Sequence, residues 1–277
     1  MADPEGKDIM NSLLTHPDII RAERIQVPEG WDPAIRLFSI RYRSSDCEVE
    51  GFAAFPPEGE GLWPAVVFNR GGNREFGTLR PGAVCRYAAA GFAGFGSQYR
   101  GNAGGTGLEE FGGADVDDVI KLADIALELP CTRKEGYYMA GHSRGGMMTY
   151  LAAARDSRIK AAAICAGVSD ARIMYYSRED SMKQVCTELI GGTPEELPAE
   201  YDKRSATMFA DRIIPPLLIC QGTDDWRVIP AQAYYMDSAL AQAGKEHRLI
   251  IYPGADHSLK GTGAYDEVIA WFNAHPL

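Results

Sequence analysis

From about residue 35 the chain alternates short apolar runs, rich in β-branched and aromatic residues, with longer segments of helical periodicity. This alternation is typical of an α/β domain, because parallel strands need crossover connections between them. The first two runs, 35–44 and 48–57, are close enough in sequence to form an antiparallel pair. The later runs are predicted to be buried, parallel strands, and they cover residues 64–70, 91–100, 136–141, 159–167, 215–222 and 247–254.

The clearest crossover helix is predicted at residues 115–129. Its apolar residues fall on one helical face, and they are Val116, Val119, Ile120, Ala123, Ala126 and Leu127. Its first turn carries Asp115, Asp117 and Asp118, and negative charge is favourable at the start of a helix. We expect these carboxylates to stabilise the helix start and to have no part in a functional site.

Composition excludes several classes of partner. The net charge is −10, from 28 Lys+Arg against 38 Asp+Glu, so a phosphate backbone is repelled and nucleic acid is not expected. Since no stretch approaches the roughly 18 apolar residues of a membrane span and the start is unlike a signal peptide, we expect no membrane partner and a cytoplasmic location. The six cysteines show no CxxC pair and are expected to be buried thiols rather than disulfides or zinc ligands.

The pentapeptide Gly141-His142-Ser143-Arg144-Gly145 is a G-x-S-x-G motif between a predicted strand and a predicted helix. A serine at such a turn has a strained backbone, so the residues two before and two after it must be small. Its hydroxyl then stands at a helix N-terminus, where developing negative charge is stabilised. The alternative is a glycine-rich turn with an incidental serine, and the flanking elements favour Ser143 as a nucleophile.

A serine nucleophile needs a base, and the base needs an orienting acid. This architecture presents the acid and then the histidine after later strands. The run that ends at Gly222 is followed by Asp224 and Asp225, and the run that ends at Gly254 is followed by Asp256 and His257. Spacing alone does not choose between Asp224 and Asp225 as the acid.

Only one of the five histidines follows a buried strand in a loop. His16 and His275 lie near the termini, His247 opens a strand, and His142 is too close along the chain to reach its neighbour's hydroxyl. His257 is therefore the predicted base.

An oxyanion hole is expected from two backbone N–H groups. One belongs to Arg144, the residue after the nucleophile, and the other to the loop after an earlier strand. The Gly71-Gly72 turn after residues 64–70 occupies that place. The side chains of Arg70, Arg144 and Arg227 are expected to be solvated or salt-bridged, although each could recognise an anionic substrate group.

These motifs together resemble the catalytic domain of the prolyl oligopeptidase family of serine peptidases, within the α/β-hydrolase superfamily. The resemblance covers residues 38–272, and it rests on the segments RYRSSDCEVEGFAAFPP, QYRGNAGGTGLEEFGGADVDDV, GHSRGG, IGGTPEELPAEYDKRSA, QGTDDWRV and YPGADHSL. It implies an α/β-hydrolase fold, with a mostly parallel central sheet and helices on both faces. It also implies that Asp225 is the acid, that His257 is the base and that Gly72 supplies the second oxyanion donor. Arg70 and Asn73 depart from the family's usual His and Pro at that turn.

The expected organisation is an N-terminal appendage over 1–34 and an α/β-hydrolase catalytic domain over 35–277. Residues 169–210 are polar and longer than an ordinary connection, so they are predicted to be a lid or a helical insertion. The family's peptidases commonly carry an N-terminal β-propeller, which 34 residues cannot build.

The predicted function is cleavage of an acyl bond by Ser143, His257 and Asp225, in a peptidase that acts on small peptides or amides. A carboxylesterase and a non-catalytic ligand-binding protein of the same fold are the alternatives. No glycine-rich phosphate motif or metal-ligand cluster is found in the sequence, so no cofactor or metal is expected. The expected partner is a small-molecule or peptide substrate, and homo-oligomerisation is left open.

Overall fold

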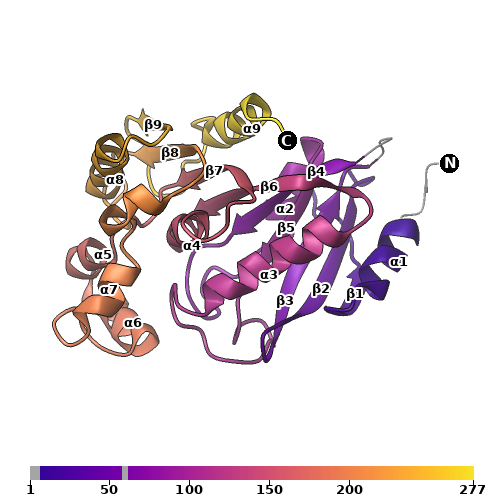
Figure 1. Ribbon diagram of the computed structural model, residues 1–277, viewed down its shortest axis with the longest axis horizontal. Helices are drawn as coiled ribbons and strands as arrows, with labels where there is room; N and C mark the ends of the chain where they lie inside the picture. The colour runs from indigo at the N-terminus through magenta and orange to yellow at the C-terminus, as the bar shows by residue number, and fades with distance from the viewer. Residues whose placement is uncertain (1–6, 58–61) are drawn as a thin grey trace. The chain divides into compact units, whose positions relative to one another are not determined.

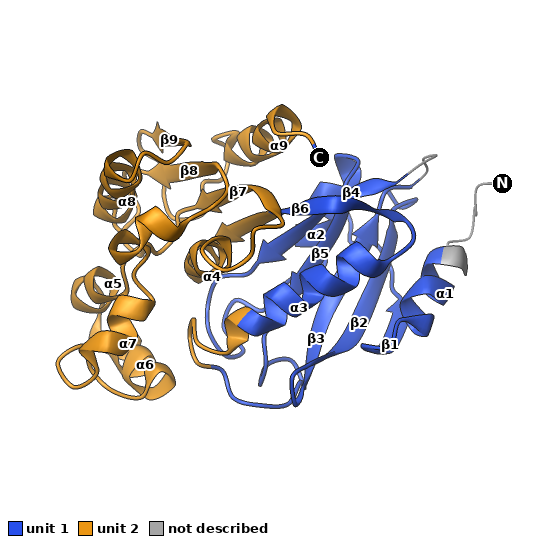
Figure 2. Cartoon of the chain, viewed as in Figure 1, with its two compact units in different colours: residues 1–109, 117–138, 277 blue, residues 110–116, 139–276 orange. Residues whose placement is uncertain are grey.

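The protein is described by a computed structural model that covers residues 7–57 and 62–277. The chain divides into two compact units (Figure 2). Unit 1 comprises residues 1–109, 117–138 and 277, and unit 2 comprises residues 110–116 and 139–276.

Unit 1 contains a sheet with the strand order β1-β2-β3-β5-β4, followed by β6, whose residues 139–142 belong to unit 2 (Figure 1). β1, β2, β3 and β5 pair in antiparallel fashion, whereas β5 and β4 are parallel. The predicted antiparallel pair is confirmed, because β2 and β3 pair along their whole lengths. The strand bounds are β1 Ile19–Arg24, β2 Arg36–Ser44, β3 Cys47–Phe55, β4 Trp63–Asn69, β5 Ala93–Ser97 and β6 Thr132–His142.

β1 is a strand that the sequence did not predict, since residues 1–34 were expected only to form an appendage. Its sequence IIRAER is paired with β2, and Ala22 lies opposite Ile40. It is preceded by helix α1, Lys7–Thr15.

Helix α2, Gly82–Ala89, packs against the sheet of unit 1. Val84, Cys85 and Ala88 of α2 form a buried cluster with Leu37 and Ala54 of the strands. Burial of each larger side chain of this kind, such as valine or leucine, stabilises the folded state by roughly 1.5–3 kcal/mol.

Helix α3 is found at Asp115–Glu128, where the periodicity predicted it. Its predicted apolar residues are buried, except that Ile120 and Leu127 are half-buried. The burial of its first turn was not predicted: Asp115 and Asp118 are fully buried. Arg100 donates to Asp118 Oδ1 at 2.8 Å through its Nη2 and to Oδ2 at 2.8 Å through its backbone N–H. A buried carboxylate needs such a partner, since desolvation of an unpaired charge is costly.

Unit 2 contains three parallel strands in the order β7-β8-β9. Helix α4 packs against β7, α8 against β8 and β9, and α9 against β7 and β8. The sequence predicted these three strands. The bounds are α4 Arg144–Ala153, β7 Ile159–Cys165, β8 Leu217–Gly222, α8 Ala231–Gln242, β9 His247–Tyr252 and α9 Ala264–Ala274.

The polar segment between β7 and β8 is helical. It contains α5 Ala171–Ser177, α6 Asp180–Ile190 and α7 Pro198–Lys203, followed by two short 3-10 helices, η1 Ala206–Met208 and η2 Ala210–Arg212. Asp170 caps α5, because its carboxylate accepts hydrogen bonds from the backbone N–H groups of Arg172 and Ile173.

The six cysteines are all within the described residues, and they are thiols. Five are buried, as the sequence predicted, and Cys131 is half-buried. Within residues 7–57 and 62–277, no helix has the length and apolar character that a membrane crossing requires.

We expect the Arg100–Asp118 pair to make a measurable contribution to the free energy of unfolding. Breaking a buried ion pair by removing one partner leaves the other charge desolvated, so Asp118→Asn is expected to lower the free energy of unfolding by about 3 kcal/mol. Urea denaturation measures this. The control is Glu128→Gln on the same helix, because the exposed Glu128 carboxylate only hydrogen-bonds to the ring of His16, and its loss is expected to cost less than about 1 kcal/mol. Equal effects of the two substitutions would contradict the prediction.

Candidate active site

Ser143 lies at the sharp turn between β6, which ends at His142, and α4, which begins at Arg144. Its backbone has φ 60° and ψ −125°, a conformation that residues with a Cβ rarely adopt. Hydrogen bonds fix this conformation on both sides. Its N–H donates to the carbonyl of Cys165 at 3.0 Å, and its own carbonyl accepts from Gly146 at 2.9 Å and from Val168 at 3.1 Å.

Glycines in and just after the motif meet a steric requirement. A Cβ placed on Gly141 would collide with the carbonyl oxygen of Gly145, and a Cβ on Gly146 would lie 2.6 Å from the Cα of Gly167. Only glycine therefore allows the turn and the following helix to approach β7 this closely. The side chain of Ser143 is left half-buried rather than covered.

Asp225 and His257 meet through a hydrogen bond of 2.8 Å between Asp225 Oδ2 and His257 Nδ1. β8 and β9 are parallel, and their last residues, Gly222 and Tyr252, are register partners. The loops that follow the two strands therefore lie at the same edge of the sheet, where open α/β sheets bind their ligands.

The environment of Asp225 favours its ionised form. The side chain is buried, which by itself would raise its pKa, but hydrogen bonds from His257, Val228 and Gln221 outweigh burial and lower the pKa of the carboxyl. Oδ1 also accepts the backbone N–H of Arg227 at 2.9 Å. A carboxylate with this many donors is held in one orientation.

The two competing carboxylates are placed differently. Asp224 is exposed, and its Oδ1 accepts a hydrogen bond from Thr223. Asp256 is also exposed, and its Oδ1 accepts from the backbone N–H and the hydroxyl of Ser258. Of the three, Asp225 is the one in contact with the imidazole of His257.

His142 has a contact that the sequence did not reveal. Its Nε2 donates to the backbone carbonyl of His257 at 2.8 Å, and the two ring centres are 4.8 Å apart. The residue before Ser143 is thus tied to the loop that carries His257. Ser143 and His257 both belong to unit 2.

Gly72 lies in unit 1, in the loop after β4, and has φ 71°. The loop is organised by Arg70, whose side chain is buried and donates to the carbonyl oxygens of Gln98, Gly71 and Arg74. Arg70 therefore joins the backbone of its own loop to that of Gln98, the residue after β5. The role of Gly72 as an oxyanion donor stays a prediction.

The other two arginines beside the motifs differ in exposure. Arg144 is buried and forms an ion pair with Asp115, as the salt-bridge alternative predicted. Arg227 is exposed and lies over the ring of Trp226, 5.3 Å from its centre. Arg178, from the helical segment, packs on the same ring and donates to the carbonyl of Arg227 at 3.2 Å. The helical segment thereby contacts the loop that carries Asp225.

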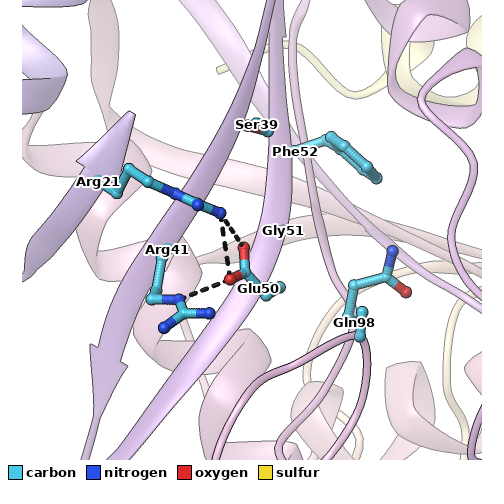
Figure 3. A pocket seen from close by; sticks show the side chains of 8 residues that line it. Arg21, Ser39, Arg41, Glu50, Gly51, Phe52 and Gln98 are labelled. Atoms are coloured by element: carbon cyan, nitrogen blue, oxygen red, sulfur yellow. Dashed lines mark hydrogen bonds and ion pairs between the residues drawn. The ribbon is translucent and has the colours of Figure 1, made fainter. Parts of the chain in front are cut away.

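Unit 1 contains a cavity of about 380 Å³ that the sequence did not indicate (Figure 3). Glu50 lies between Arg21 and Arg41, and its carboxylate accepts from both, at 3.2 Å and 2.5 Å. The two cations of this cavity are therefore engaged by one buried carboxylate.

Within the part of the chain that the structure describes, no group of three or more His, Cys, Asp or Glu side chains is arranged to hold a metal ion.

Comparison with known proteins gives consistent results. The sequence model of the prolyl oligopeptidase family matches residues 83–275. The uncharacterized peptidase YtmA of Bacillus subtilis is 34% identical, over 76% of this chain and 82% of its own length. The uncharacterized peptidase YuxL of the same organism is 26% identical, over 98% of this chain and 43% of its own length.

Two solved structures are similar at the level of fold and sequence. A puromycin-hydrolyzing peptidase of Mycobacterium tuberculosis is 26% identical with a TM-score of 0.74, over 92% of this chain and 39% of that one. The acylaminoacyl peptidase of Pyrococcus horikoshii is 25% identical with a TM-score of 0.73, over 85% of this chain and 40% of that one. This chain thus spans about two fifths of the length of either protein.

The fold is that of an α/β-hydrolase, with a mostly parallel central sheet and helices, as the sequence predicted. Its relatives are peptidases, which makes the protein a serine hydrolase. The chain belongs to the prolyl oligopeptidase family, whose motifs the sequence had indicated.

The lowered pKa of Asp225 predicts a pH dependence of stability. A carboxyl that ionises more easily in the folded chain stabilises it fully above its ordinary pKa of about 4, and this contribution is lost as the pH falls through the folded-state value. The difference in unfolding free energy between the wild type and Asp225→Asn is therefore expected to be constant above about pH 5 and to shrink below about pH 4. Urea unfolding at several pH values, with Asp224→Asn as the matched control, measures it. A difference that stays constant into strong acid would show that the ionised carboxylate is not favoured by the fold.

Proposed function

We propose that the chain is a peptidase that cleaves small peptides or amides through an acyl-enzyme intermediate on Ser143. The observation that carries this proposal is the hydrogen bond between Asp225 and His257 Nδ1. An imidazole held through Nδ1 offers Nε2 as the base, which is the arrangement that activates a serine. The strained backbone of Ser143, in the same unit, adds support.

The proposed reaction has two halves. In the first, Ser143 Oγ attacks the scissile carbonyl while His257 Nε2 takes the hydroxyl proton, and Asp225 stabilises the resulting imidazolium. The C–N bond then breaks, and His257 returns the proton to the leaving amine. In the second half, His257 deprotonates a water molecule that attacks the acyl-enzyme. The C–O bond to Ser143 then breaks, His257 returns the proton to Ser143 Oγ, and the carboxylic acid is released.

The negative oxygen of each tetrahedral intermediate needs hydrogen-bond donors. The backbone N–H of Arg144 is the first proposed donor, because it opens α4 directly after the nucleophile. Gly72 remains the proposed second donor on the strength of the family resemblance.

The peptidase proposal is tested with a substrate panel. Wild-type protein is expected to hydrolyse aminoacyl p-nitroanilides and to react with a fluorophosphonate probe, and Ser143→Ala is expected to lose both activities. Hydrolysis of p-nitrophenyl esters without anilide hydrolysis would identify a carboxylesterase instead. Hydrolysis that persists in Ser143→Ala would refute the proposed nucleophile, and absence of both labelling and hydrolysis in the wild type would point to a non-catalytic protein.

The role of Asp225 is tested against its neighbour. Asp225→Asn is expected to lower kcat by roughly 10³- to 10⁴-fold, because the amide cannot stabilise the imidazolium and favours the wrong tautomer. Asp224→Asn, at an exposed site, is expected to keep kcat within about threefold of the wild type, as surface substitutions away from a site have small effects. Steady-state kinetics on the best anilide decides, and a loss confined to Asp224→Asn would reverse the assignment.

A further inference from the structure

The side chain of Arg144 is held in an unusual place for an arginine. It is 2% exposed, and its Nη2 forms an ion pair with Oδ2 of Asp115, which is completely buried. Its guanidinium carbon lies 4.7 Å from the ring centre of Phe111. Arg144 is thus held at two places. Helix α4 fixes its backbone, and Asp115 and Phe111 fix its guanidinium group.

The segment that carries Asp115 is itself held in place. Asp115 Oδ1 accepts the backbone N–H of Gly112 at 3.0 Å, so both carboxylate oxygens are engaged. Arg204 donates to the carbonyl oxygens of Phe111 at 3.1 Å and Glu110 at 3.2 Å. Residues 110–116 belong to unit 2 together with Ser143, although the rest of α3 belongs to unit 1.

A buried ion pair is weak evidence for stability alone, because desolvation of two charges offsets most of their attraction. Its geometric effect is different, since a guanidinium and a carboxylate bond in fixed directions. An oxyanion donor depends on position, because a displacement of about 1 Å in an active site can cost roughly 10²-fold in rate. Arg144 combines the two features. Its backbone N–H is the proposed oxyanion donor, and its side chain is the guanidinium that the buried ion pair holds in place.

We propose that Asp115 is a positioning residue for the reaction: by anchoring the Arg144 side chain, it holds the backbone N–H of Arg144 in the direction that stabilises the oxyanion. This inference rests on the proposed function. Asp115 does not touch the substrate in this account, and it acts through Arg144 alone.

The primary test is Asp115→Asn. A misplaced oxyanion donor stabilises the transition state less, while binding of the ground state changes little. We therefore expect kcat to fall about 10- to 100-fold while KM changes by less than about threefold. A peptide aldehyde that carries the acyl part of the best anilide substrate forms a tetrahedral adduct with the serine. Its Ki is expected to rise by the same factor as kcat/KM falls, which a purely structural role would not produce.

The matched control is Asp118→Asn, which removes another fully buried carboxylate of the same helix from its pair with an arginine, Arg100. Its kcat per titrated active site and its aldehyde Ki are expected to equal those of the wild type. If Asp115→Asn and Asp118→Asn change these two quantities equally, or if neither changes them, the positioning role is wrong.

A double variant keeps the test decisive if Asp115→Asn fails to fold. In Asp115→Asn combined with Arg144→Met neither partner leaves a buried charge, and such replacements are often tolerated. A folded double variant with the expected loss of kcat and aldehyde affinity supports the proposal, and wild-type values of both overturn it. Fluorophosphonate labelling of the wild type, with loss in Ser143→Ala, separates a failure of this inference from a failure of the proposed function.

Discussion

The backbone strain at Ser143 is the constraint on which the site depends. A residue at φ 60° costs about 1–3 kcal/mol, and it persists only where the surroundings over-determine it. Here the hydrogen bonds to β7 and its following loop, through Cys165 and Val168, hold the turn from outside, and the glycines at 141 and 146 remove the atoms that would push it apart. The hydroxyl is therefore presented by the sheet and the first turn of α4 rather than by a flexible loop.

The acid and the histidine depend on a second constraint, the parallel pairing of β8 and β9. Because Gly222 and Tyr252 are register partners, both strands end at the same edge of the sheet. The loop that carries Asp225 therefore lies beside the loop that carries His257. Burial of Asp225 would raise its pKa, yet the donors collected by its loop reverse that effect. The contact from His142 to the His257 carbonyl connects the two constraints, since it joins the strained turn to the histidine loop.

Sequence patterns predicted most of this architecture because the patterns are local. Apolar runs located the parallel strands, and the glycines around Ser143 located the turn, since each reflects sterics within a few residues. β1 was missed because IIRAER is short and half charged, as suits a strand paired on one side only. The spacing along the sequence did not distinguish Asp224 from Asp225. The family resemblance favoured Asp225, which contacts His257 in the structure.

The first turn of α3 shows why the rest could not be predicted. Its aspartates have a sufficient local explanation in the helix dipole, and a pattern with a local explanation gives no sign of a distant partner. Yet Asp115 pairs with Arg144 and Asp118 with Arg100, and both carboxylates are fully buried. Positions three apart lie on one helical face, so two buried acids there each require a cation that only the tertiary fold supplies. When acidic residues at the start of a helix lie on the same face as its apolar residues, we therefore expect them to form buried ion pairs. Interaction with the helix dipole alone does not explain them.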